Sequence, residues 1–228
     1  MCLSATVSFS AGALLVAGGG FAITKAWQIN KRYLPVALMP LFAGFQQLLE
    51  GGVWMGVNAG DPNTTLVNAL GYIFFTWFMW PFWIPVATYL LEPPESRRKP
   101  MMLAMAVAGL AFGLALYIPH LLNPDWVEVS VNRDSLAYEG TMILDYLMPR
   151  PMTYFIYLFL IVVPPAISTY LHMRWFALTL VAVIVVDILF LRYAYISFFC
   201  ILAGLGTLHL IYIIVRNKCA RECPVLFA

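Results

Sequence analysis

Charged side chains are scarce in this sequence. Only 11% of its 228 residues are charged and 62% are hydrophobic, whereas soluble domains carry about 25% charged residues. A water-soluble chain of this length could not bury so much apolar surface, so we expect its side chains to face a lipid bilayer. The formal net charge is only +2 and there is no long basic run, which excludes nucleic acid as a partner.

Cysteine is sparse, and the last apolar stretch of the sequence contains no lysine. The four cysteines are Cys2, Cys200, Cys219 and Cys223, too few and too scattered for a disulfide framework. The last apolar stretch, 194–215, contains no lysine. A retinal protein needs a lysine there for its Schiff base, so retinal is excluded as a cofactor.

The sequence consists mainly of apolar runs of about 20 residues, the length that a membrane-spanning helix needs. The predicted spans are 3–24, 34–57, 66–91, 101–122, 152–171, 175–191 and 194–215. The break at 192–195 contains no glycine or proline, so six spans with one bent helix is the alternative. We therefore expect an all-α fold: one integral membrane bundle of seven transmembrane helices over residues 1–228.

Lysine and arginine are distributed unevenly between the two sides of this bundle. Of the 13 basic residues, ten fall on one side, and only Arg133, Arg150 and Arg192 fall on the other. Cytoplasmic loops are enriched in basic residues, so we expect a cell-membrane protein with its N-terminus outside and its C-terminus in the cytoplasm. No basic residue precedes the first apolar run, which favours a retained helix over a cleaved signal.

The longest segment outside the predicted membrane is 123–151, on the outer side. It contains VEVSV, then NRD, then SLAYE. Alternating apolar residues on both sides of a turn sequence predict a short β-hairpin. A loop of this length is either a lid over a site or a passive cap. The TMILDYLMP stretch that follows is expected to lie along the membrane surface.

The second predicted span contains polar residues that lipid disfavours, namely Gln46, Gln47 and Glu50. At 100° per residue they share one helix face with Trp54. An acidic group at mid-span costs at least about 2.5 kcal/mol. Glu50 is therefore expected to face the bundle, where it is protonated, paired or metal-bound. These four residues are candidates for binding a ligand or an ion.

Other chemically active residues are predicted to lie at the same depth. Asp187 belongs to the outer half of its span and is a further ligand candidate, with pairing to Arg192 as the alternative. His120 ends the fourth span and Cys2 begins the chain on the same side. Cysteine, histidine and glutamate form a credible zinc ligand set, so Cys2, Glu50 and His120 are candidate ligands for zinc or another divalent metal.

The opening MCLSATVSFSAGA and the stretch QQLLEGGVW resemble an uncharacterised bacterial family of multi-pass membrane proteins. Its members begin Met-Cys-Phe-Ser-Ala and carry Gln-Gln-x-x-Glu-Gly in the second helix; here Leu3 replaces the phenylalanine. The resemblance covers the first two spans and implies no known activity. It implies one shared site formed by Cys2, Ser4, Gln46, Gln47 and Glu50.

Three functions remain open at this point, and whether the protein is an enzyme is undecided. The first is a binding protein, transporter or channel whose outward-facing intramembrane polar site takes a small solute, a proton or a metal cation. The second is a membrane-embedded, zinc-like metalloenzyme. Ceramidase-like hydrolases resemble the chain in helix number, but they use paired histidines in the last helix, where this chain has only His209. The third is a partner subunit or sensor, or a homo-oligomer, that packs through the aromatic stretch 77–83.

Overall fold

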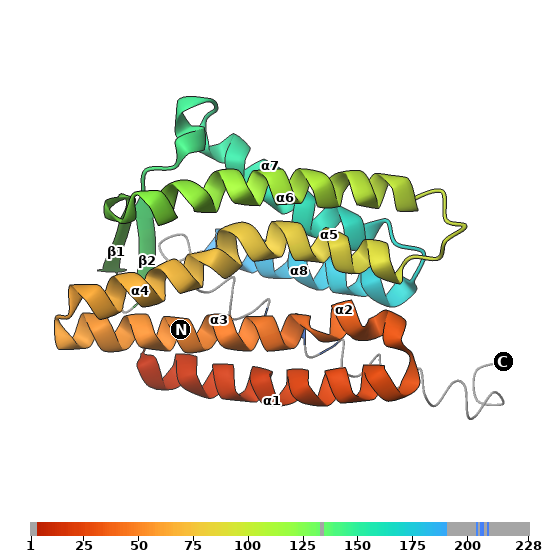
Figure 1. The fold of residues 1–228 in the computed structure, drawn as a ribbon, viewed down its shortest axis with the longest axis horizontal. Helices are drawn as coiled ribbons and strands as arrows, with labels where there is room; N and C mark the ends of the chain where they lie inside the picture. The colour runs from red at the N-terminus through yellow and green to blue at the C-terminus, as the bar shows by residue number, and fades with distance from the viewer. Residues whose placement is uncertain (1–3, 133–134, 191–203, 205, 208, 210–228) are drawn as a thin grey trace.

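Long helices run alternately in opposite directions through the main body of the protein (Figure 1). The computed structural model describes residues 4–132, 135–190, 204, 206, 207 and 209. Its helices are α1 Ala5–Ile29, α2 Leu34–Ala37, α3 Met39–Ala59, α4 Pro62–Ile73, α5 Trp80–Leu91, α6 Lys99–Leu122, α7 Arg150–Ala166 and α8 Leu171–Phe190. A π-helical turn, Phe74–Met79, joins α4 and α5 into one rod.

Three of these rods are long and apolar enough to cross a membrane: Ala5–Ile29, Pro62–Leu91 and Lys99–Leu122. Arg150–Ala166 and Leu171–Val186 are shorter apolar helices. The protein is therefore mostly helical and has the character of a membrane protein. Seven spans are not confirmed: within the described residues these three helices alone are long and apolar enough, and the last predicted span and the break at 192–195 lie largely outside those residues.

The predicted boundary between the fifth and sixth spans is wrong. The break was expected around 172–174, but these residues form the first turn of α8 and the turn lies at 167–170. Pro164 and Pro165 lie in the last turn of α7, which ends at Ala166, directly after them. Two consecutive residues without a backbone N–H remove two helical hydrogen bonds, which favours termination here.

The α5 and α6 helices approach closely where α6 carries glycine. A Cβ atom on Gly109 would lie 2.0 Å from the carbonyl oxygen of Pro81, and one on Gly113 would lie 3.0 Å from Phe78. A larger residue at Gly109 would have to move the backbone of α5, and one at Gly113 would press on Phe78 of the π turn. The two glycines mark close packing of α6 against this rod.

A two-stranded antiparallel sheet covers one end of the bundle (Figure 1). Strand β1 is Val127–Asn132 and strand β2 is Ser135–Gly140, which confirms the predicted hairpin. Leu136 is fully buried and Tyr138 is 5% exposed. The ring of Tyr138 stacks on Tyr72 of α4, with centroids 4.4 Å apart. The hairpin is thus packed into the bundle end, which we call the hairpin end.

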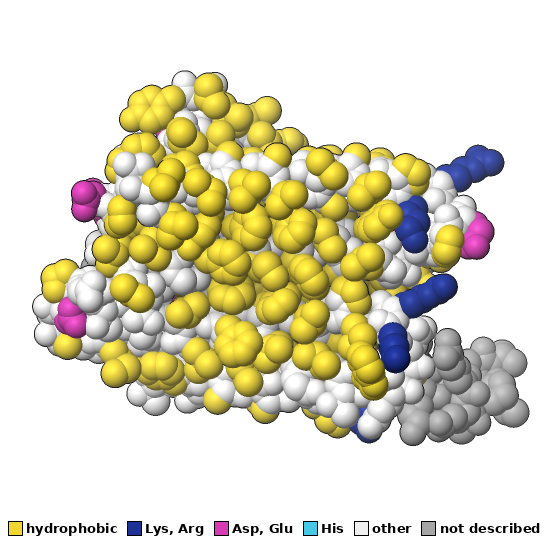
Figure 2. All heavy atoms as spheres, viewed as in Figure 1, with side chains coloured by type: hydrophobic (Ala, Val, Ile, Leu, Met, Phe, Trp, Pro, Cys, Tyr) yellow, Lys and Arg dark blue, Asp and Glu magenta, His cyan; other side chains and the backbone are white. Residues whose placement is uncertain are grey.

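The surface shows an apolar belt along the helices, with basic side chains at the end opposite the hairpin (Figure 2). They come from the end of α1, the α1–α2 and α5–α6 connections and the start of α8. Apart from Arg150, they include every described lysine and arginine: Lys25, Lys31, Arg32, Arg97, Arg98, Lys99 and Arg174. This distribution matches an apolar belt in lipid with charge at its borders. We call this end the basic end.

Candidate functional site

The polar residues predicted on α3 share one buried face. We call this set the α3 polar face: Gln46, Gln47, Glu50 and Trp54. Gln46 and Gln47 are 1% exposed, Glu50 is 0% exposed and Trp54 is 5% exposed. Phe45 and Met55, on other sides of the helix, are 44% and 56% exposed. The prediction that Glu50 faces the bundle rather than lipid is confirmed.

Gln46 is held at both ends of its side-chain amide. Its Nε2 donates to Oγ1 of Thr76 over 2.7 Å, and its Oε1 accepts from the indole Nε1 of Trp80 over 2.7 Å. The Thr76 hydroxyl donates in turn to the backbone carbonyl of Tyr72 over 3.3 Å. Because each amide atom has a partner, the orientation of Gln46 is fixed. Gln46 therefore forms a rigid wall of the α3 polar face.

The π-helical turn Phe74–Met79 determines which way these partners point. A π turn is rare, contains one extra residue and often occurs at functional sites. Pro81 follows it and lacks the N–H that would complete a regular α-helical pattern. Within this turn, Thr76 bonds Gln46 on α3 and Trp77 contacts His120 on α6. Sequence reasoning missed this turn, for which Pro81 is the only local signal.

His120 is fully buried among aromatic rings at the hairpin end. Its ring centroid lies 4.4 Å from that of Trp77 and 6.2 Å from that of Trp126. Nδ1 lies 2.8 Å from the carbonyl oxygen of Leu116. A carbonyl only accepts, so the contact with Leu116 requires the tautomer that carries its proton on Nδ1, and the backbone of Thr141 is a second polar group beside the ring. Metal-binding histidines commonly use this arrangement.

The other two predicted ligands, Cys2 and the side chain of Asp187, are not among the described parts of the chain. The backbone of Asp187 belongs to α8. No group of three His, Cys, Asp or Glu side chains comes together as a metal site within the described part of the chain. The metal set of Cys2, Glu50 and His120 therefore stays a prediction.

The aromatic stretch 77–83 packs within the chain itself. Trp77 is 5% exposed and Trp80 is 9% exposed. The indole Nε1 of Trp83 donates to the carbonyl of Pro35 over 2.9 Å. This stretch therefore offers no large exposed tryptophan face for a partner protein, and a partner or a second copy stays a prediction.

A second buried acid, Glu92, was overlooked in the sequence. It follows α5 at the basic end and is 2% exposed. Its carboxylate accepts hydrogen bonds from Ser96 Oγ over 2.7 Å, from Ser168 Oγ over 2.9 Å, and from both the backbone N–H and the hydroxyl of Thr169. Its partners saturate the carboxylate. Glu92 therefore ties the α5–α6 loop to the α7–α8 turn, with no oxygen left over for a ligand.

The ionisation of Glu92 follows from the same contacts. Burial alone raises the pKa of this carboxyl group, but the hydrogen bonds from Thr169, Ser96 and Ser168 outweigh burial and hold the pKa below its ordinary value. Nearby, Arg98 Nη1 donates to the carbonyl of Ile167 over 2.9 Å, which adds another link between the same two segments. The only nearby signal in the sequence is Ser96, four residues after the acid.

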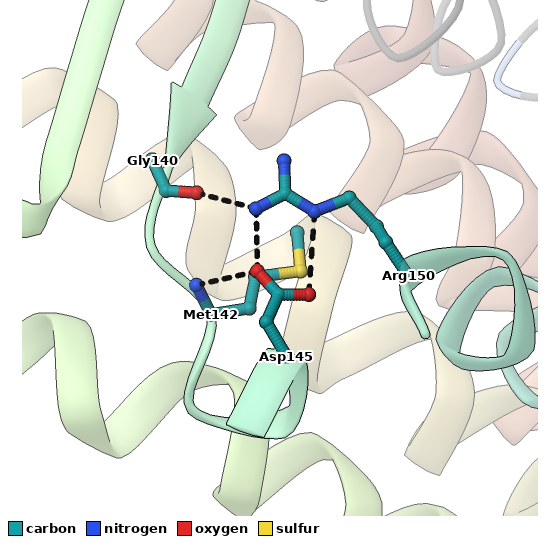
Figure 3. A network of polar contacts seen from close by, with 4 residues as sticks. All are labelled: Gly140, Met142, Asp145 and Arg150. Atoms are coloured by element: carbon teal, nitrogen blue, oxygen red, sulfur yellow. Dashed lines mark hydrogen bonds and ion pairs between the residues drawn. The ribbon is translucent and has the colours of Figure 1, made fainter. Parts of the chain in front are cut away.

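Arg150 fastens the hairpin to the start of α7 (Figure 3). Its Nη2 donates to the carbonyl of Gly140 over 2.9 Å and pairs with Asp145 over 2.5 Å. Asp145 also accepts from the backbone N–H of Met142 over 3.3 Å. The hydrogen bond from Arg150 is the main reason that the pKa of Asp145 is lowered. We call this set the Arg150 clamp.

Comparison with known proteins gives a family but no activity. No curated protein and no solved structure matches the chain. A family model described as a family of unknown function (DUF6629) matches residues 1–224. This agrees with the expected membership of an uncharacterised family, whereas the bacterial source and the family motifs stay predictions. The chain belongs to this family of unknown function, DUF6629.

Proposed function

We propose that the protein is a membrane-embedded binding protein whose α3 polar face takes a proton or a small cation. The observation that carries the proposal is Glu50, an acidic residue that is 0% exposed in the middle of a helix with an apolar surround. Acids at such positions mark proton or ion sites by default. Carboxylate and amide oxygens are also the ligands that hard cations prefer.

The fixed geometry around Gln46 supports this proposal. Its amide is oriented by Thr76 and Trp80, and Gln47 and Glu50 lie on the same buried face, one turn apart. Side chains that are held in place before binding lose little conformational entropy when a ligand arrives. An oriented oxygen set therefore suits an ion better than a flexible organic solute.

Binding is a better description than transport across the whole membrane. A transport path would need an opening at the basic end as well as at the hairpin end. At the basic end, Glu92 and Arg98 join the α5–α6 loop to the α7–α8 turn through several hydrogen bonds. These contacts favour a site with access from one side, with the basic end in the cytoplasm.

The test measures the thermal unfolding midpoint of the purified protein at neutral pH against a panel of monovalent and divalent cations. We expect at least one cation to shift the midpoint in the wild type, and Glu50→Gln to abolish that shift. Glu92→Gln is the matched control: it removes another buried carboxylate, outside the site, and should keep the shift. An identical response in wild type and Glu50→Gln would overturn the proposal.

A zinc-dependent enzyme is the second candidate, favoured by the geometry of His120. The bond from Nδ1 to Leu116 fixes the ring, as the second nitrogen of a metal-binding histidine commonly does. Elemental analysis of the purified protein should then find zinc in one-to-one ratio in the wild type and lose it in His120→Phe. Protein without stoichiometric metal after purification in zinc-supplemented medium would remove this candidate.

A further inference from the structure

Buried polar atoms that lack a hydrogen-bonding partner gather at the hairpin end. Among the described residues, no partner with normal hydrogen-bond geometry is present for these atoms: Ser8 Oγ, His120 Nε2, Ser135 Oγ and Thr153 Oγ1. The backbone of Thr141 also interacts with the His120 ring, and His172 Nε2 is a further such atom at the basic end. The side chains of Ser8, His120 and Ser135 are 0% exposed, and that of Thr153 is 2% exposed. They come from the first turn of α1, the last turn of α6, the start of β2 and the first turn of α7, all of which lie at the hairpin end (Figure 1).

Hydroxyl groups elsewhere in the helices behave differently. Thr24, Thr88 and Thr179 each donate to the backbone carbonyl four residues earlier, at 2.9, 2.8 and 3.1 Å. This local bond is the usual solution for a hydroxyl group in an apolar helix. Ser8 and Thr153 have no such bond to a described residue. Their surroundings must therefore supply another partner.

Water is the partner that fits. Buried polar groups in native proteins are nearly always satisfied by protein or by ordered water, and an internal water typically makes about three hydrogen bonds. A set of hydroxyl and imidazole groups from four elements offers several bonds to each water. A single unsatisfied atom would be a local defect, whereas a group at one end indicates a hydrated space.

We propose that water enters beneath the β1–β2 hairpin and forms a vestibule that leads to the α3 polar face. The inference rests on the proposed function in naming the vestibule as the ion's entry route. The hairpin residues Leu136 and Tyr138 belong to one packed cluster with Trp54 and Tyr72. Trp54 is one turn from Glu50 on α3, and Tyr72 is one turn from Thr76, so the route beneath the hairpin ends at the proposed site.

Acidic side chains at the hairpin end make the electrostatic potential at the vestibule negative. Asp61 caps α4, Asp125 follows α6 and Glu128 lies on β1. The described basic residue at this end, Arg150, is paired with Asp145. Acidic side chains around an opening concentrate cations and exclude anions. The vestibule is therefore selective for positively charged solutes.

The test introduces single cysteines into a chain whose native cysteines are replaced by serine. Ser8→Cys, Ser135→Cys and Thr153→Cys place a thiol at the proposed vestibule with little change in volume. Ala22→Cys and Ala26→Cys are the dry controls, because both alanines are 0% exposed on the part of α1 near the basic end. Glu128→Cys, on the exposed face of β1, is the accessible control.

Reconstituted protein is treated with small thiol-specific methanethiosulfonates that differ in charge. We expect the three vestibule cysteines to react many times faster than Ala22→Cys, and faster with the cationic reagent than with the anionic one. Reaction no faster than that of Ala22→Cys would overturn the vestibule. Equal rates with both reagents would overturn its charge selectivity.

Radiolytic hydroxyl-radical footprinting of the unmodified protein tests for water in the vestibule without any substitution. Internal water generates radicals beside the residues that it touches, so we expect oxidation of Trp77 and His120. Met39 and Met102, which are intrinsically reactive but 0% exposed, should stay unmodified. Protection of all four residues would contradict the vestibule. If Trp77 and His120 are oxidised but Glu50→Gln keeps the wild-type response to cations, only the proposed function is contradicted.

Discussion

Gln46 is a single residue whose two hydrogen bonds link α3 to the π turn and to the start of α5. Thr76 and Trp80 depend on the same amide group, one as acceptor and one as donor. Since all three side chains are at most 9% exposed, losing the amide would leave polar atoms without water. The residue therefore stabilises the bundle as well as shaping the α3 polar face.

Replacement of Gln46 by leucine should be costly. The variant leaves the Trp80 indole N–H and the Thr76 hydroxyl without their acceptor and donor, and each orphaned group costs about 1–3 kcal/mol. We expect the free energy of unfolding in detergent to fall by about 2–4 kcal/mol. Phe45→Leu, on the exposed side of α3, should change it by less than about 0.5 kcal/mol. Equal effects from both substitutions would contradict the network.

Glu92 makes stability depend on acid pH. Its folded-state pKa lies below the ordinary value of 4.5, so its contribution is fully present above that value and is lost as pH falls through the folded-state pKa. Titration of the unfolding midpoint below neutral pH should show this loss in wild type and less of it in Glu92→Gln. Glu95→Gln, at an exposed neighbour, should keep the wild-type profile. A wild-type profile in Glu92→Gln would count against the assignment.

The burial of a single residue was predictable from the sequence where it depended only on the helix that contains the residue. Glu50 and its neighbours fall on one face by helix geometry alone, and an acid in an apolar helix has to turn inward. The partners of Glu92 were not predictable, since Ser168 lies 76 residues away in sequence. Which distant hydroxyl meets an acid depends on which helices are neighbours, and one sequence does not contain that information.

Helix pairs show the same contrast at the scale of elements. The α5–α6 approach was predictable in kind from Gly109 and Gly113, because small residues permit close contact between membrane helices. The identity of the opposing backbone, at Pro81, was not. Helix ends were less predictable than helix existence. The hydropathy pattern continues through Pro164 and Pro165, so it carries no mark of where α7 ends.

Gly109→Ala tests the α5–α6 contact. The new Cβ would lie 2.0 Å from the carbonyl oxygen of Pro81, so the helices must move apart. Overpacking of this kind lowers the free energy of unfolding by about 1–3 kcal/mol. Gly20→Ala in α1 is the control: nothing lies within 4 Å of its Cβ position, and alanine favours helix by up to about 1 kcal/mol. A neutral Gly109→Ala would show that the contact is looser than described.

The Arg150 clamp should govern how often the hairpin opens. Arg150→Gln removes the ion pair with Asp145 and weakens the bond to Gly140. Because both side chains are partly exposed, the expected cost is only about 0.2–1 kcal/mol. Hydrogen–deuterium exchange should become a few times faster at the β1 and β2 amides and stay unchanged in α1. Uniform acceleration across all helices would mean general destabilisation rather than hairpin release.

At the scale of the whole molecule, the apolar belt and the basic end have the character of a membrane protein. The expected orientation places the hairpin end outside and the basic end in the cytoplasm. The helical nature of the chain and its membrane character follow from composition and were predictable. The number of spans depends on residues near the C-terminus, outside the described residues, where the sequence has no clear turn signal.

The orientation can be measured in intact cells that carry single-cysteine variants. A membrane-impermeant maleimide should label Asp61→Cys, at the start of α4, but label Glu95→Cys, in the α5–α6 loop, only after the cells are opened. Both positions are exposed, so differences in labelling report the side of the membrane. Labelling of Glu95→Cys alone in closed cells would reverse the orientation and place the proposed ion entry in the cytoplasm.

The π turn at Phe74–Met79 also has a consequence for how this family can change over time. It contains one residue more than the same stretch of α-helix would need. Deleting one of its residues would let the rod continue as a regular α-helix, with α4 and α5 close to their present orientation. The widened turn that places Thr76 beside Gln46 and Trp77 beside His120 would then be lost in a single mutational event. Homologues that differ in length at this turn should therefore differ in ligand, and gaps there offer a way to sort the family into functional subgroups.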